Sequence, residues 1–412
     1  MPRMAWGFAS FLACGALLLG STMVDAAPLA EPSGKVAARA RPVRRDQLLA
    51  GFNPRARELI DGRLTSRLAR GHRAVLSLEP SLDGFVAKLL KKNEVPYAGV
   101  VALEPSTGKL LAYVSHSSAE PNGSDRVLDA SAPAASVFKI VTATALLNEG
   151  LSPTRTTCYH GGSSHLTKSE LTDNPRLDKA CASLTGALGF SINCVFGKLA
   201  LKHLDPKKLR KQASLYGFGE PLPFDVPTEA SALDVPTEPV EFARTAAGFW
   251  HMHLSPLHGA VLAGTVANEG RMLRPTMIDR VVDESGNAIY RSEPVLHRKV
   301  MERSVASQVG TMMRATVQQG TSRRTFHDGR GRPLLPGISV AGKTGTLNRE
   351  LPSFRGYTWW VGFAPVEQPK IALAVLVVNS PQWRIKASQV AAETLRHYLV
   401  DAPKASRGVA RK

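Results

Sequence analysis

Apolar and polar positions follow two different periods along the chain, and the change of period predicts where strands and helices lie. Residues 97–115 contain two apolar runs around the turn Pro105-Ser-Thr-Gly108, which predicts a β-hairpin. Just before it, Phe85, Leu89 and Leu90 have the spacing of one helix face. The ordered part of the chain is therefore expected to begin at about residue 75.

The middle of the chain has helical spacing, and strand-like runs return near its end. Helices are expected over four ranges: 137–147, 187–204, 240–268 and 300–318. Strands are expected at 338–343, 358–364 and 371–379, followed by an amphipathic helix at about 388–399. Because strands lie at both ends with helices between them, we expect an antiparallel sheet covered by helices, an α+β architecture.

The first 74 residues differ in composition from the rest. Residues 1–26 have an early arginine, an apolar run and small residues before Ala27, the order of a secretory signal peptide. An uncleaved anchor helix is the alternative, because the apolar run is just long enough to span a bilayer. Residues 27–74, rich in Ala, Arg and Pro, are interpreted as a basic linker with a short helix at 54–70. Residues 401–412 are interpreted as a basic tail, which leaves 75–400 as the main domain.

The formal net charge of +18 raises the question of an anionic partner. An exported protein does not meet the genome, so nucleic acid is not expected. Positive charge is dense between Lys35 and Arg73, where it would contact an anionic membrane surface; a solvated leader is the alternative.

Cysteine use agrees with export to the cell envelope. Cys158 and Cys181 bracket a polar loop, and an oxidising compartment favours a disulfide between them. His160 and His165 lie in the same loop, but their irregular spacing does not favour a zinc site. The cluster His251-Met-His253 with His258 gives no metal site either, and no cofactor is expected.

Ser136-Val-Phe-Lys139 is the sharpest local candidate for chemistry. If Ser136 opens a helix, one turn brings Lys139 to the same face, so that the amine meets the hydroxyl. A lysine can deprotonate a serine only if its pKa is depressed, and Lys139 lies in an apolar run. A capping serine with a surface lysine would be the ordinary explanation of such a pair.

Two later motifs strengthen this interpretation. Ser191-Ile-Asn193 supplies a second hydroxyl and an amide, and Lys343-Thr344-Gly345-Thr346 ends a predicted strand. Ser-x-x-Lys, Ser-x-Asn and Lys-Thr-Gly in this order form the signature of penicillin-binding proteins and β-lactamases.

From about Val75 to Leu399 the chain resembles the transpeptidase domain of penicillin-binding proteins. Further segments carry the likeness, among them residues 99–112, 254–263, 267–270, 317–321 and 358–364. The resemblance implies the penicillin-binding transpeptidase or β-lactamase-like fold, with an all-helical lobe beside the sheet. The leader, cleaved or retained, predicts that the rest of the chain lies outside the cytoplasm, in the cell envelope on the extracytoplasmic (periplasmic) side of the inner membrane.

The resemblance also implies a role for each site residue. Ser136 would be the acylated nucleophile and Lys139 its general base, while Ser191 and Asn193 would relay protons and hold the substrate amide. Lys343 and Thr344 would bind the terminal carboxylate, and Gly345 would leave the strand edge open. The backbone N–H groups of Ser136 and Thr346 would form the oxyanion hole.

The activity implied is D,D-transpeptidation of peptidoglycan stem peptides, with β-lactam antibiotics as acylating mimics. No glycosyltransferase pattern is found, so polymerisation of glycan strands is not expected of this chain; whether it crosslinks alone or with a glycan-polymerising partner stays open. Two alternatives remain open. A hydrolase, either a D,D-carboxypeptidase or a β-lactamase, would use the same acyl-enzyme; a non-catalytic β-lactam sensor or envelope scaffold would keep the fold alone.

Overall fold

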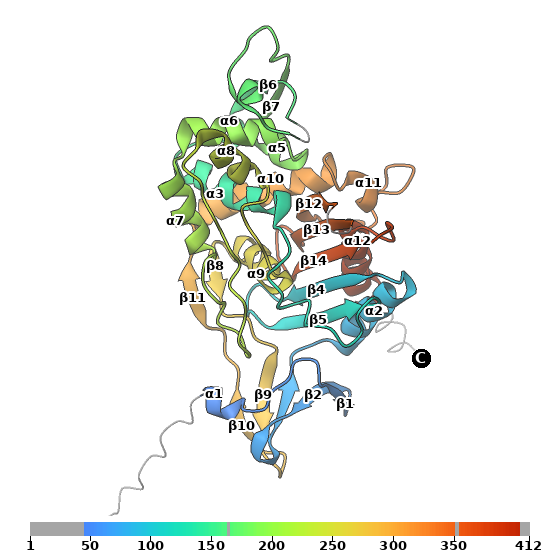
Figure 1. Cartoon of the computed structure of the whole chain (residues 1–412). Coiled ribbons are helices and arrows are strands. Elements are labelled where there is room, and N and C mark those ends of the chain that lie inside the picture. Colours follow the sequence, from blue (N-terminus) through green and yellow to red (C-terminus); the bar gives the residue numbers. More distant parts are fainter. Residues whose placement is uncertain (1–44, 163–164, 351–353, 404–412) are drawn as a thin grey trace, which may run out of the picture. The chain divides into compact units, whose positions relative to one another are not determined.

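The computed structural model describes residues 45–162, 165–350 and 354–403 (Figure 1). All of them belong to one unit, Arg44–Lys412. The predicted signal peptide or anchor, the first part of the predicted linker and residues 404–412 of the predicted tail lie outside the described residues. Within the described ranges, no helix is both long and apolar enough to cross a bilayer.

A five-stranded antiparallel sheet forms the centre of the described residues, in the order β12-β13-β14-β4-β5. Its strands come from both ends of the domain, as predicted: β4 (Tyr97–Leu103), β5 (Leu110–Ser117), β12 (Ala341–Arg349), β13 (Arg355–Ala364) and β14 (Ile371–Asn379). β12 pairs only with β13 among these strands, so one of its edges is open.

Both faces of this sheet are buried, which explains the unbroken apolar run of β14. Trp359 and Leu376 face one hydrophobic core, and Trp360 and Val375 face the other. Helix α9 (Pro256–Ala267) packs on the first face, while α2 (Pro80–Lys92), α12 (Ala387–Arg396) and η3 (His397–Asp401) cover the second.

A helical lobe lies beside the β12 end of the sheet (Figure 1). Its helices are η2 (Ala135–Phe138), α3 (Lys139–Asn148), α4 (Lys168–Leu171), α5 (Leu184–Gly189), α6 (Asn193–His203), α7 (Pro206–Leu215), α8 (Pro239–Ala247) and α10 (Arg303–Gln318). The short helix α11 (Arg323–Phe326) follows α10 and packs against α12. Helix α10 contacts both α5 and β12, and so joins the lobe to the edge of the sheet.

Two predicted helices are each broken in two, at residues that matter for the site. The helix expected over 187–204 is interrupted at Ser191, whose φ is +60°. The helix expected over 240–268 ends at Gly248, whose φ is +85°, and a new helix starts after the N-cap Ser255. Left-handed backbone ends a helix, because the next N–H group no longer points along its axis.

The prediction of a linker with a helix at 54–70 is wrong for the described residues. Three strands in this region belong instead to a second antiparallel sheet, with the strand order β1-β2-β3-β9-β10. Its elements are α1 (Arg45–Leu48), β1 (Glu58–Ile60), β2 (Arg63–Arg67), η1 (Ala69–Gly71), β3 (Arg73–Leu76), β9 (Ile278–Val282) and β10 (Ala288–Arg291). Asp61 and Gly62 both have positive φ and form the two-residue turn of a hairpin. That turn outweighs the helical spacing of the leucines.

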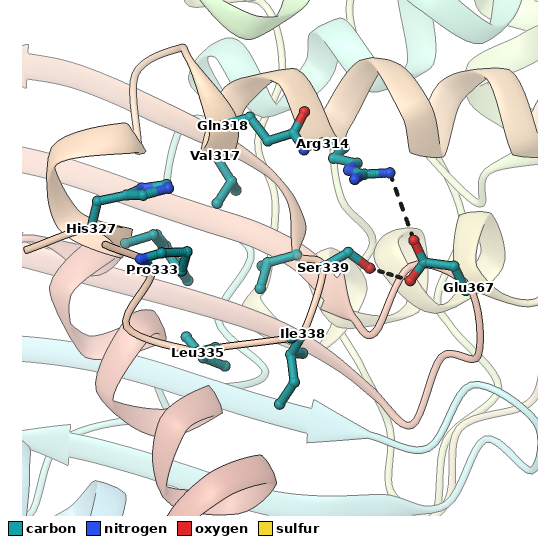
Figure 2. Close-up of a pocket in the computed structure, with 12 residues that line it drawn as sticks. Arg314, Val317, Gln318, His327, Pro333, Leu335, Ile338, Ser339 and Glu367 are labelled. Atoms are coloured by element: carbon teal, nitrogen blue, oxygen red, sulfur yellow. Dashed lines mark hydrogen bonds and ion pairs between the residues drawn. The ribbon is translucent and has the colours of Figure 1, made fainter. Parts of the chain in front are cut away.

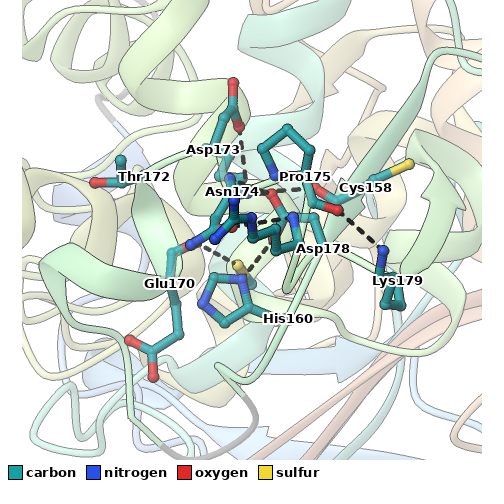
Figure 3. Close-up of polar contacts among 12 residues, drawn as sticks. Cys158, His160, Glu170, Thr172, Asp173, Asn174, Pro175, Asp178 and Lys179 are labelled. Atoms are coloured by element: carbon teal, nitrogen blue, oxygen red, sulfur yellow. Dashed lines mark hydrogen bonds and ion pairs between the residues drawn. The ribbon is translucent and has the colours of Figure 1, made fainter.

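The disulfide expected between Cys158 and Cys181 is present. It links β6 (Thr156–Tyr159) to β7 (Ala180–Ser183), which form a two-stranded antiparallel sheet. Another two-stranded antiparallel sheet is formed by β8 (Arg271–Leu273) and β11 (Leu296–Lys299). Near the disulfide, Asp178 accepts hydrogen bonds from Lys198 and pairs with His160 at 2.5 Å (Figure 3). These two contacts lower the pKa of Asp178 although its burial acts in the opposite direction.

Candidate active site

A cavity of about 300 Å³ lies between the helical lobe and the open edge of β12. Six residues predicted from the motifs line it: Ser136, Ser191, Asn193, Thr344, Gly345 and Thr346. The motifs did not include the other lining residues, which are Thr321, Thr358, Trp359, Lys386 and Ser388. Lys139 and Lys343 are fully buried and reach residues of this lining. The three motifs therefore meet in one place.

The turn that carries Ser136 is held in an unusual backbone conformation. Ala135, just before it, has φ +50°, which costs a residue with a side chain about 1–2 kcal/mol. The N–H of Ala134 donates to Met252 O (3.0 Å), and the indole of Trp359 donates to Pro133 O (2.8 Å). Strands and loops from distant parts of the chain thus hold the strained turn that presents the hydroxyl.

Lys139 is surrounded by three oxygens. Its Nζ lies 2.9 Å from Ser136 Oγ and 2.6 Å from Asn193 Oδ1, and it contacts the carbonyl of Ala247. The ring of Phe196 covers it at 5.6 Å. The side chain has no exposed surface, so water does not compete for these contacts.

Burial changes the protonation of both site lysines. It holds the pKa of Lys139 well below its usual value, and the charge of Lys343 lowers this pKa further. Burial lowers the pKa of Lys343 to about 7. A lysine with a lowered pKa is a neutral amine over more of the pH range, and a neutral amine can accept a proton from a hydroxyl.

The second motif connects the two lysines. Ser191 lies in the break between α5 and α6, and its positive φ turns the hydroxyl toward β12. Lys343 Nζ donates to Ser191 Oγ at 2.8 Å and to Thr344 O at 2.9 Å. Asn193 follows as the first residue of α6 and contacts Lys139. A polar chain therefore runs from Lys343 through this motif to the nucleophile.

On β12, the structure gives Gly345 a different reason for being a glycine. A methyl group there would lie 3.1 Å from Ala135 Cβ and 3.2 Å from Trp359 Cβ. Gly345 therefore lets the strand approach the turn before Ser136. This reason is additional to the open strand edge that the sequence analysis expected. Next to it, the hydroxyl of Thr344 hydrogen-bonds that of Thr321 (2.6 Å), a residue to which the sequence analysis assigned no role.

Gly248 is a further residue that sequence reasoning missed. It ends α8 directly after Ala247, whose carbonyl contacts Lys139. A methyl group at Gly248 would lie 2.5 Å from Ala135 O and 3.0 Å from Ser136 Cα. In the sequence, the one signal for this residue is that a glycine stands at the end of a helical pattern.

The histidines that suggested a metal have other partners. His251 Nε2 lies 2.8 Å from Glu241, and His258 is buried with Nε2 2.7 Å from Tyr216 O. Burial lowers the pKa of His258 to about 4. Among the described residues no group of three or more metal-binding side chains is found.

A separate cavity of about 380 Å³ contains none of the predicted site residues. It lies between α10, α11 and the segment before β12, and apolar side chains form much of its wall (Figure 2). At its rim Glu367 accepts a hydrogen bond from Ser339 and pairs with Arg314 at 3.6 Å. Because the residues that line this second cavity are mostly apolar, we do not assign it a catalytic role.

Comparison with known proteins agrees with this arrangement. Residues 98–399 match the family model described as penicillin binding protein transpeptidase domain. A curated relative, peptidoglycan D,D-transpeptidase PbpA of Mycolicibacterium smegmatis, is 28% identical over 81% of this chain and 72% of its own length. PbpA of Mycobacterium tuberculosis is also 28% identical, over 68% of this chain and 61% of its own length. The stage V sporulation protein D of Bacillus subtilis is matched over 48% of its length.

Solved structures share the fold. The D,D-transpeptidase domain of a peptidoglycan glycosyltransferase from Eggerthella lenta superposes with a TM-score of 0.67 at 24% identity, covering 80% of this chain and 83% of that one. The imipenem acyl-enzyme complex of penicillin-binding protein A from M. tuberculosis gives 0.65 at 22% identity, covering 79% of each chain.

The packing at Gly248 leads to a prediction. In Gly248→Ala, the methyl group must displace the turn that carries Ser136, and we expect the rate of acylation by a labelled penicillin to fall roughly a hundredfold. Thermal or urea unfolding should show a loss of about 1–2 kcal/mol, because the residue keeps a left-handed backbone.

Gly219→Ala is the matched control. Gly219 has φ +89°, but a methyl group there would meet no atom within 4 Å. This variant should lose similar stability and keep its acylation rate. Equal acylation rates in the two variants would contradict the role given to Gly248.

Proposed function

The chain belongs to the penicillin-binding protein transpeptidase family, and on that basis we propose that it is a D,D-transpeptidase that crosslinks peptidoglycan stem peptides through an acyl-enzyme on Ser136. Its substrates would be stem peptides ending in D-Ala–D-Ala. β-Lactam antibiotics would acylate the same hydroxyl.

The observation that carries this proposal is the set of contacts at Lys139. A neutral amine has two N–H groups and one lone pair, whereas an ammonium has three donors and no acceptor. Asn193 Oδ1 and Ala247 O, two acceptors, would take the two N–H groups. The three oxygens alone would equally suit the three N–H groups of an ammonium, so it is the lowered pKa of Lys139 that favours the neutral form. In that form its lone pair would face Ser136 Oγ at 2.9 Å and could accept the proton.

Acylation would proceed in two steps. Lys139 takes the proton of Ser136, and Oγ attacks the carbonyl carbon of the penultimate D-alanine. The oxyanion lies at the backbone N–H groups of Ser136 and Thr346, where such donors contribute about 3 kcal/mol in comparable enzymes. The C–N bond then breaks; Ser191 gives its proton to the amine of the leaving D-alanine and takes one from Lys343.

Lys343 would bind the terminal carboxylate of the donor, with Thr344 and Thr321 beside it. Its contact with Ser191 at 2.8 Å supports a shared path for the proton. In the second half of the reaction, an amine of a neighbouring stem peptide attacks the ester of Ser136. The new peptide bond forms, and the serine oxygen recovers its proton.

We further propose that the protein works on the extracytoplasmic side of the membrane, in the cell envelope. The predicted leader and the disulfide between Cys158 and Cys181 support an oxidising location. The basic residues between Lys35 and Arg73 would contact anionic lipid, and a separate enzyme would polymerise the glycan strands.

Mass spectrometry after incubation with a labelled penicillin tests the function directly. We expect one penicilloyl group on the peptide that contains Ser136, and no label in Ser136→Ala. Lys139→Met should fold and lose most of the labelling rate, because the serine has no base. An unlabelled wild-type protein would refute the proposal.

Turnover separates the proposed transferase from the hydrolases. A transpeptidase should keep its penicilloyl group for many minutes and should hydrolyse nitrocefin only slowly. Rapid, repeated turnover of nitrocefin would show that water removes the acyl group, and would favour a β-lactamase.

The lysine pKa values predict how acylation depends on pH. Toward low pH the rate should fall as Lys139 gains a proton; above about pH 7 it should fall as Lys343 loses the charge that binds the substrate carboxylate. The second-order rate constant for penicillin acylation should therefore pass through a maximum whose high-pH side begins near pH 7.

The variant Lys343→Arg distinguishes the low-pH fall of the acylation rate from the high-pH fall. A guanidinium remains charged over this range, so the fall above pH 7 should disappear while the fall at low pH remains. A wild-type rate that keeps rising from pH 7 to pH 9 would contradict the role given to Lys343.

A further inference from the structure

The far end of the active-site cavity carries a lysine that the family motifs do not include. Lys386 immediately precedes α12 and lines the same cavity as Ser136. The N–H of Ala387 donates to Thr358 Oγ1 at 3.1 Å, and Thr358 is the register partner of Thr346 on β12. Thr346 and Thr358 lie on neighbouring strands about 5 Å apart, so the start of α12 lies beside Thr346 on the β13 side of β12, opposite its open edge. From there the Lys386 side chain reaches the cavity that it lines.

The charges around Lys386 favour an anionic ligand. Among the residues that line the cavity none is acidic, and hydroxyl groups make up much of its polar surface. Within the described ranges Lys386 forms no ion pair, and its ammonium lies 5.9 Å from the ring centre of Trp383. The other two lysines at this site, Lys139 and Lys343, are engaged with Ser136 and Ser191. Lys386 is thus an exposed cation in a groove without a counter-charge.

The direction of β12 says which part of the substrate would reach it. Under the proposed function, the terminal carboxylate of the donor lies at Lys343 and Thr344, and the reacting carbonyl lies at Thr346. A peptide that pairs with the open edge of β12 therefore continues past Thr346, on the amino-terminal side of the reacting bond. Through Thr358, the start of α12 lies at the level of Thr346, and the Lys386 side chain would extend from there toward this part of the substrate.

We propose that Lys386 is a specificity-determining residue that binds a side-chain carboxylate of the donor stem peptide, on the amino-terminal side of D-Ala–D-Ala. This inference rests on the proposed function. The substrate class that fits is a stem peptide whose residue before D-Ala–D-Ala carries a free side-chain carboxylate, as a diamino-diacid does. Ser388, hydrogen-bonded to Thr325 at 3.3 Å, adds a hydroxyl to the same end of the cavity.

Three synthetic donors test this proposal. They share the terminal D-Ala–D-Ala and differ in the preceding residue, whose side chain ends in a free carboxylate, in the corresponding amide, or in no such group. Release of D-alanine in the presence of an acceptor amine gives kcat/KM for each donor. We expect the wild-type protein to prefer the carboxylate donor by about tenfold or more, because the contact is a charge-assisted hydrogen bond.

Variants at and near Lys386 identify the cause of the preference. Lys386→Met should bring the ratio of carboxylate to amide donor close to one, mainly through KM, and Lys386→Arg should retain the preference. Arg384→Met is the matched control: Arg384 is an exposed cation two residues earlier that pairs with Glu94 at 3.5 Å and does not line the cavity. It should leave the ratio unchanged.

Penicillin labelling separates failure of this inference from failure of the proposed function. If wild-type Ser136 is labelled but the three donors react equally, Lys386 does not read a carboxylate and the inference is overturned. The same holds if Lys386→Met keeps the preference, or if Arg384→Met abolishes it. If Ser136 is not labelled at all, the proposed function itself fails.

Discussion

The arrangement of the site depends on one costly feature, the burial of the Lys139 amine beneath Ser136. An ammonium without water loses most of its solvation, and the nearby charge of Lys343 adds a second penalty. The protein meets this cost with two acceptors, Asn193 Oδ1 and Ala247 O, which satisfy the N–H groups of a neutral amine. Under the proposed function, the lone pair of this neutral amine would face the serine hydroxyl, the third oxygen in contact with Nζ.

The rest of the fold keeps these groups in register. The central sheet brings the early hairpin and the three late strands together, so that the edge of β12 faces a turn more than 200 residues earlier in the chain. The indole of Trp359 donates a hydrogen bond to Pro133 O, and Gly345 lets β12 approach Ala135. Gly248, at the end of α8, packs against the same turn. A side chain at either glycine would meet the turn, which explains why both positions are glycine.

Much of this could be predicted from the sequence, and the misses share a cause. The strands of the central sheet were visible because both faces are buried, which leaves runs such as residues 371–379 wholly apolar. The trio of motifs was visible because its chemistry needs fixed residue types at fixed spacing. The second sheet was missed because its leucines fit a helix as well as a hairpin, and the turn at Asp61 and Gly62 decided between them. Thr321 and Lys386 reach the cavity from segments far from the motifs in the sequence, so no local pattern singles them out, and the local signal at Gly248 marks a helix end but not its contact with the turn before Ser136.

The central claim is that Lys139 is a neutral amine at the pH at which the protein works. Heteronuclear NMR of protein labelled with ¹³C and ¹⁵N in lysine tests it, with the Lys139 signal assigned from its absence in Lys139→Met. We expect this signal to titrate well below the usual range of a lysine and to be that of a neutral amine at the pH at which acylation is measured. A Lys139 signal that titrates in the usual range of a lysine, so that the amine is charged at that pH, would contradict the proposed role.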